Sequence, residues 1–149
     1  MTYRSPVTDI RFILDHIVPI APVAETEMFA EATPDMVDAI LTEAGKMCED
    51  VLAPLQRAGD LHPARLENGV VRTPTGFKAA WDQMADGGWM GLSAPEEWGG
   101  QGLPKVLGLA VMEMFHGANM AFALCPMLSF GAIEALLAHG TDTQKAMYQ

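Results

Sequence analysis

Apolar residues recur at helical spacing along most of the 149-residue chain, and this period limits the fold more than any other feature. The first such stretch follows Thr8 as a candidate cap and ends before Pro19; its apolar residues are Ile10, Ile13, Leu14 and Ile17. A longer helix is predicted from Thr33 as N-cap and Pro34 at the first helical position, and we expect Pro54 to end or kink it. Its expected core stripe comprises Val37, Ile40, Leu41, Ala44, Met47, Cys48, Val51 and Leu52.

The second half of the chain continues the same pattern. A third helix is predicted over residues 75–85, with Gly87-Gly88 as its stop. Pro104 opens a fourth helix that is apolar almost all the way round, and we expect it to break at Pro126. A further helix is predicted over 130–138. The sequence therefore predicts an all-α fold, a bundle of about five to six helices with one Gly/Pro-rich loop.

Charge is plentiful but unevenly placed. Nine Lys and Arg against 19 Asp and Glu give a formal net charge of −10, which excludes a nucleic-acid binder that works by neutralising phosphates. Residues 106–140, in contrast, contain only Glu113 and Glu134 as formal charges. We expect this apolar back third to be covered by other protein surface, and we expect the chain to form homo-oligomers through it.

The compartment and the relation to membranes follow from the cysteines and from the apolar back third. Cys48 and Cys125 match no disulfide or zinc spacing, so we expect two reduced thiols and a cytoplasmic location. Residues 114–133 carry no formal charge, and an apolar segment of this length is long enough to span a membrane. Polar residues, Gly and Pro interrupt that window and acids flank it, so buried helices and no membrane span are predicted.

Two groups of residues have a spacing that is found in ligand-binding sites, and each also has a simpler structural explanation. Glu113 and His116 have the i, i+3 spacing of di-iron helices, but the required second pair is missing and no metal site is predicted. Gly99, Gly100 and Gly102 precede a helix and are able to bind an anion there. Because the glycine fingerprint is incomplete, we favour a tight structural loop formed by these three glycines and Pro95.

The last residues form a helix start. Residues 141–144 read as a capping box, in which the side chains of the first and fourth residues bond each other's backbone amides. The sequence ends five residues later, too soon for a stable isolated helix. We therefore expect the natural polypeptide to continue beyond Gln149.

Two motifs resemble the N-terminal domain of the acyl-CoA dehydrogenases. The loop Gly91-Leu92-Ser93-Ala94-Pro95-Glu96-Glu97-Trp98-Gly99-Gly100-Gln101-Gly102 is similar to the family's Gly-Leu-x-x-Pro-Glu-Glu-(aromatic)-Gly-Gly-x-Gly signature. About forty residues later, Gly140-Thr141-Asp142-Thr143-Gln144-Lys145 resembles the start of a family helix. Residues 1–6 and 66–74 further resemble a long-form branch that includes methylmercaptopropionyl-CoA dehydrogenases. The resemblance divides the chain into an N-terminal extension, residues 1–32, and an incomplete helical domain, residues 33–149.

The resemblance implies a flavoenzyme that oxidises an acyl-CoA to a 2-enoyl-CoA. In the family, FAD and the catalytic glutamate are held mainly by later domains, so no catalytic residue and no bound FAD are expected in this chain. Acyl-CoA and an electron-transferring flavoprotein are the implied partners. In the family, this domain forms one wall of the acyl pocket, and the resemblance places that wall at Phe122, Leu124, Met127 and Leu128. Packing in the core of the domain explains these four apolar residues equally well. The alternative function is a non-catalytic acidic helical interaction module derived from the same domain.

Overall fold

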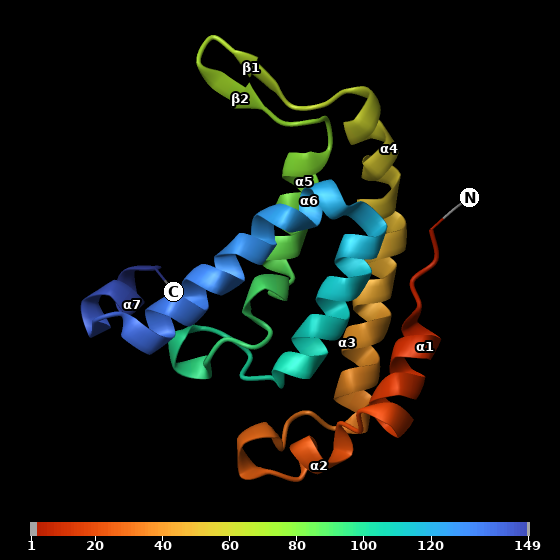
Figure 1. Cartoon of the computed structure of the whole chain (residues 1–149), viewed down its shortest axis with the longest axis vertical. Coiled ribbons are helices and arrows are strands. Elements are labelled where there is room, and N and C mark those ends of the chain that lie inside the picture. Colours follow the sequence, from red (N-terminus) through yellow and green to blue (C-terminus); the bar gives the residue numbers. More distant parts are fainter. Residues whose placement is uncertain (1–2, 149) are drawn as a thin grey trace.

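The computed structural model describes residues 3–148, and these form a mostly helical bundle (Figure 1). The predicted helical class is therefore confirmed. The helices are α1 (Val7–Phe12), α2 (Ala21–Ala24), α3 (Pro34–Met47), α4 (Ala53–Leu61), α5 (Phe77–Asp86), α6 (Lys105–His139) and α7 (Asp142–Tyr148). π-Helical turns cover Ile13–Ile17 and Cys48–Leu52, and single 3-10 turns cover Glu27–Phe29, Trp89–Gly91 and Glu96–Trp98.

A small hairpin is the departure from a purely helical fold. Strands β1 (Arg65–Glu67) and β2 (Val70–Arg72) pair antiparallel, and both are exposed. The turn between them has positive φ at Asn68 (52°) and Gly69 (78°), the backbone that an Asn-Gly pair adopts most readily. The hairpin projects beyond the helices at one end of the molecule (Figure 1).

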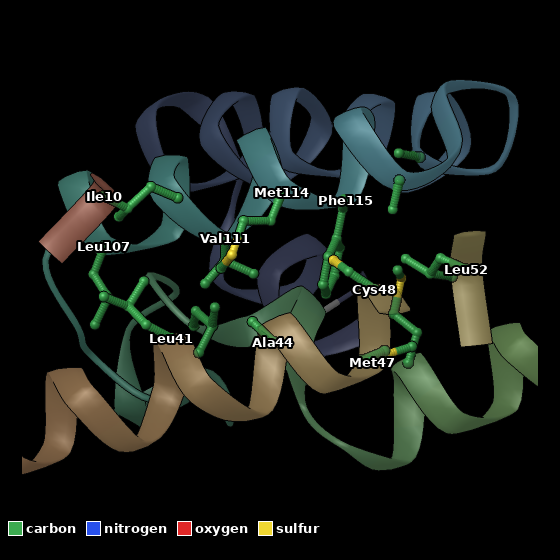
Figure 2. Packing of buried hydrophobic residues seen from close by; sticks show 14 of the residues in the cluster. Ile10, Leu41, Ala44, Met47, Cys48, Leu52, Leu107, Val111, Met114 and Phe115 are labelled. Atoms are coloured by element: carbon green, nitrogen blue, oxygen red, sulfur yellow. The ribbon is translucent and has the colours of Figure 1, made fainter. Parts of the chain in front are cut away.

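The core lies between α3 and the first half of α6 (Figure 2). The Thr33 side chain caps α3 by accepting a hydrogen bond from the Met36 amide (3.3 Å), as the sequence predicts. Six of the eight predicted stripe residues are fully buried, and Ile40 and Val51 are partly buried against them. They face the buried residues Leu107, Val111, Met114, Phe115 and Ala118 of α6.

The helix that contains α3 does not end at Pro54. A π-turn over Cys48–Leu52 joins α3 to α4, which runs on to Leu61. Because the hydrogen-bonding pattern changes just before it, Pro54 falls in the first turn of α4, where a missing N–H costs little. The π-turn thus allows the chain to remain helical on both sides of Pro54.

The break in α6 lies at Asn119 and not at Pro126 as the sequence suggested. Asn119 has φ −156° and ψ 87° inside an otherwise helical run, whereas Pro126 is accommodated within the helix that follows. The second half of α6, residues 120–139, turns back toward the start of the helix (Figure 1). Lys105 and Glu134, near the two ends of α6, form an ion pair at 2.8 Å.

Burial is incomplete in two of the apolar segments. In the N-terminal stretch, Ile10 and Leu14 are buried, but Ile13 and Ile17 are 44% and 64% exposed. Because residues 13–17 are wound as a π-helix, the four apolar residues do not share one face. In α6, the first half is buried on the side that faces α3 but leaves Leu109 70% exposed, and the second half leaves one apolar side exposed.

Within the described residues, one helix, α6, is long and apolar enough to cross a membrane. That is weak evidence, since core helices pass the same test of length and composition. The bend at Asn119 and the ion pair between Lys105 and Glu134 fold the two halves of α6 toward each other. This is not the geometry of a straight membrane crossing.

The N-terminal arm before α1 is fastened to two core helices. The Tyr3 hydroxyl donates to the Met114 carbonyl (3.0 Å), and the Ser5 amide donates to Glu49 Oε1 (2.8 Å). The Ser5 hydroxyl donates to the Gly45 carbonyl at 3.0 Å. The arm therefore covers the π-turn that contains Cys48.

The two thiols should differ sharply in reactivity. Burial raises the pKa of Cys48 to about 12; a hydrogen bond with Ser5 partly opposes this increase, and the charge of Glu49 adds to it. Cys125, in contrast, is exposed. Because the thiolate is the reactive form, we expect an aromatic disulfide reagent at pH 8 to modify Cys125 quickly and Cys48 only in denaturant. Cys125→Ser should abolish the fast phase, and a fast phase that survives this substitution would contradict the buried position of Cys48.

Candidate functional site

The second half of α6 presents an apolar side to solvent, which we call the outer face and which consists of Met120, Leu124, Met127 and Leu128. All four side chains are more than two-fifths exposed, and Leu128 is 72% exposed. Three of them, Leu124, Met127 and Leu128, are residues that the sequence places in a pocket wall. Core packing does not explain these three within this chain.

Phe122, the fourth predicted wall residue, points the other way. It is buried, and its ring packs edge-on against Phe77 (centroids 5.5 Å apart) and tilted against Trp81 (6.4 Å), both on α5. Such aromatic pairs add about 0.5–1.5 kcal/mol beyond the area that they bury. The structure therefore separates Phe122 from the outer face and assigns it to the packing of α6 on α5.

Two cavities flank the start of the second half of α6. One, of about 590 Å³, lies between α5 and α6 and is lined by Phe77, Trp81, Phe122 and Cys125 among others. The other, of about 1010 Å³, lies toward α4 and the N-terminal arm and includes Tyr3 and Leu124. Met127 and Leu128 lie outside both cavities, so the four predicted wall residues do not line one hollow within this chain.

The larger cavity has a mixed lining. Burial raises the pKa of Tyr3, and the neighbouring Cys48 adds to this effect, so the phenol stays a neutral donor to Met114. Arg57 and Asp60 pair with each other at 3.0 Å on its rim. These polar groups already have partners in the chain, which leaves the apolar residues as the main contact surface.

Asn119 is the junction of α6 and was not among the predicted site residues. Within residues 3–148 it is the one fully buried polar side chain. Its Oδ1 accepts from the Phe122 amide (3.1 Å), and its Nδ2 donates to the Leu52 carbonyl (3.1 Å). The first bond is an N-terminal cap for the second half of α6; asparagine before an apolar run is the sequence signal that could have located it.

The glycine loop before α6 uses its amides internally. Gly99 and Gly102 have positive φ (87° and 61°), and Gly100 lies so close to Ala94 that a Cβ there would stand 2.1 Å from the Ala94 carbonyl oxygen. The amides of residues 99 to 103 bond to the carbonyls of Glu96, Pro95, Gly91, Ala94 and Leu92, respectively. With these amides occupied, the loop is not arranged to bind an anion.

Glu113 and His116, the pair with di-iron spacing, lie on the first half of α6. Glu113 is exposed, and His116 Nδ1 lies 2.7 Å from the carbonyl of Met112 one turn earlier in the same helix. Among the described residues, no group of three or more His, Cys, Asp or Glu side chains is placed to hold a metal ion.

Comparison with known proteins gives a matching family model and two relatives. The family model described as "Acyl-CoA dehydrogenase, N-terminal domain" matches residues 24–149. The chain is 47% identical to 3-methylmercaptopropionyl-CoA dehydrogenase of Ruegeria pomeroyi, over 99% of the chain and 25% of that protein. It is 29% identical to the broad-specificity linear acyl-CoA dehydrogenase FadE5 of Mycobacterium tuberculosis, over 96% and 24%, respectively. The chain thus spans about a quarter of the length of these relatives.

Because the backbone of Gly100 lies against the backbone of Ala94, we predict that position 100 does not tolerate a side chain. Gly100→Ala should lower the free energy of unfolding by about 2 kcal/mol, because the added methyl group forces the loop backbone apart. Gly131→Ala is the matched control, since a Cβ there meets no atom within 4 Å, and its effect should stay within about 1 kcal/mol. Equal urea midpoints for Gly100→Ala and the unmodified chain would show that the approach of the two backbone segments is not required.

Proposed function

The chain belongs to the acyl-CoA dehydrogenase family, and on that premise we propose that it is the N-terminal domain of an enzyme that oxidises an acyl-CoA thioester to a 2-enoyl-CoA. The single observation that carries its part in this reaction is the exposed outer face on α6. In a domain with a buried core, a contiguous apolar side of one helix is suited to contact an apolar ligand or a neighbouring domain. We assign Leu124, Met127 and Leu128 to the wall of the acyl pocket.

The work of this domain is positional rather than chemical. The outer face carries no acid or base, and Glu134, further along the same helix, is paired with Lys105. The apolar wall would hold the acyl chain and exclude water from it. We assign the carboxylate that removes the α-proton to a part of the enzyme beyond this chain.

FAD supplies the hydride acceptor in this family, and we propose that residues 3–148 do not hold its diphosphate. Binding its diphosphate calls for free backbone amides or basic side chains. The amides of the glycine loop are occupied, and the chain has a net charge of −10. We propose that FAD contacts other parts of the enzyme, that an electron-transferring flavoprotein reoxidises it, and that the whole enzyme is a cytoplasmic homo-oligomer.

The flavin assignment predicts the behaviour of the isolated chain. Residues 1–149, purified and soaked with FAD, should stay colourless, because they offer no free anion-binding amides in the glycine loop. Absorbance near 450 nm after gel filtration is the measurement, with free FAD run alone as the control. Yellow protein with one flavin per chain would overturn the assignment of FAD to other parts of the enzyme.

The pocket wall predicts a change in chain-length preference. In the full-length enzyme, Leu128→Trp should reduce kcat/KM for long acyl-CoA relative to short acyl-CoA by roughly tenfold, because the larger side chain shortens the space for the acyl chain. Leu109→Trp is the matched control: it is on the first half of α6 and is 70% exposed, against 72% for Leu128. If Leu128→Trp leaves the ratio of kcat/KM for long and short acyl-CoA unchanged, the wall assignment is refuted. If the unmodified enzyme does not oxidise acyl-CoA, the proposed function itself is refuted.

A further inference from the structure

We propose that Asn119 is a positioning residue for acyl-chain selection, which it controls through the direction of the second half of α6 and without touching the substrate. The proposal rests on the function proposed above. It starts from the two hydrogen bonds of one side chain, which join the bend in α6 to the π-turn after α3.

The carboxamide of Asn119 is suited to this junction because it offers a donor and an acceptor on one short planar group. The acceptor holds the Phe122 amide in the first turn of the second half, and the donor holds the Leu52 carbonyl. Both Asn119 and Leu52 are fully buried, so neither bond is replaced by water when it is lost. The bend is therefore tied at one point to the most buried part of the core.

Beyond Asn119, the contacts that hold the second half are fewer and more exposed. Phe122 packs on Phe77 and Trp81 within its first turn, close to the bend. Near the far end, Lys105 and Glu134 form an exposed ion pair, a kind of contact that contributes little to stability. A small rotation at Asn119 would move Met127 and Leu128 further than it moves residues near the bend.

The geometry thus connects one buried side chain to the position of the pocket wall. Leu124, Met127 and Leu128 lie on the helical segment that Asn119 caps. A misplacement of about 1 Å at a binding surface is enough to change a rate up to a hundredfold. Asn119 should consequently affect which acyl chain is preferred more than it affects the maximal rate with the best substrate.

The first measurement is a distance between the two halves of α6 in the full-length protein. Spin labels at Leu109→Cys and Ala132→Cys, two exposed positions, are introduced with Cys125→Ser to remove the exposed native thiol. We expect a narrow distance distribution with Asn119 and a shifted or broadened one in Asn119→Ser, whose hydroxyl keeps a cap acceptor but is too short to reach Leu52. An unchanged distribution in Asn119→Ser overturns the proposal.

The second measurement is the ratio of kcat/KM for long and short acyl-CoA. Asn119→Ser should change this ratio roughly tenfold, while Val37→Ala, a core substitution in α3 away from the bend, should lower stability and leave the ratio unchanged. A ratio that changes equally in both variants, or in neither, overturns the proposal.

If Asn119→Ser does not fold, Asn119→Thr takes its place, because its hydroxyl keeps the cap acceptor, its methyl group fills part of the vacated space and its side chain is also too short to reach Leu52. An unmodified enzyme without activity on acyl-CoA would remove the proposed function and with it the claim about acyl selection. The spin-label distance would then still decide whether Asn119 sets the bend, so the two failures are distinguishable.

Discussion

A carboxamide buried between two helices determines how this domain is assembled. Leaving either hydrogen-bonding group of Asn119 without a partner in the apolar core would cost about 1–3 kcal/mol. Both are satisfied only when α6 stops its regular winding at residue 119 and when the Leu52 carbonyl, at the end of the π-turn, faces it. The bend in one helix and the irregular turn in the other are therefore parts of a single arrangement.

The remaining packing follows from that arrangement. With α6 bent at Asn119, its first half covers the buried stripe of α3, and the N-terminal arm closes over both through Tyr3 and Ser5. The second half is left with Phe122 turned inward toward α5 and with the outer face turned toward solvent. One helix thus contributes both to the core and to an exposed apolar surface.

The elements that could be predicted from the sequence are those in which local chemistry and burial agree. They are the Thr33 cap, the α3 stripe and the capping box of α7, and each depends on residues within a few positions of one another. In the capping box, the Thr141 amide donates to Gln144 Oε1 (2.9 Å) and the Gln144 amide donates to the Thr141 hydroxyl (3.3 Å). The misses depend on distant partners. Prolines suggested an end or kink at Pro54 and a break at Pro126. The winding instead changes in the π-turn just before Pro54 and breaks at Asn119, where tertiary hydrogen bonds decide. Among the candidate wall residues, the sequence could not distinguish the inward Phe122 from the outward Leu128, because that choice depends on how α5 packs.

The glycine loop places a different kind of restriction on how such a domain can vary. Amides of residues 99 to 103 bond to carbonyls from the earlier part of the same loop, several of them in the short run from Gly91 to Pro95. An inserted or deleted residue within either run, 91–95 or 99–103, would move the amides and carbonyls on one side of it away from their partners, whereas side-chain replacements outside the three glycines would leave these backbone bonds intact. Among descendants of this chain, the loop should therefore keep its length and the glycines at 99, 100 and 102, and the point at which α6 begins should stay fixed relative to α5.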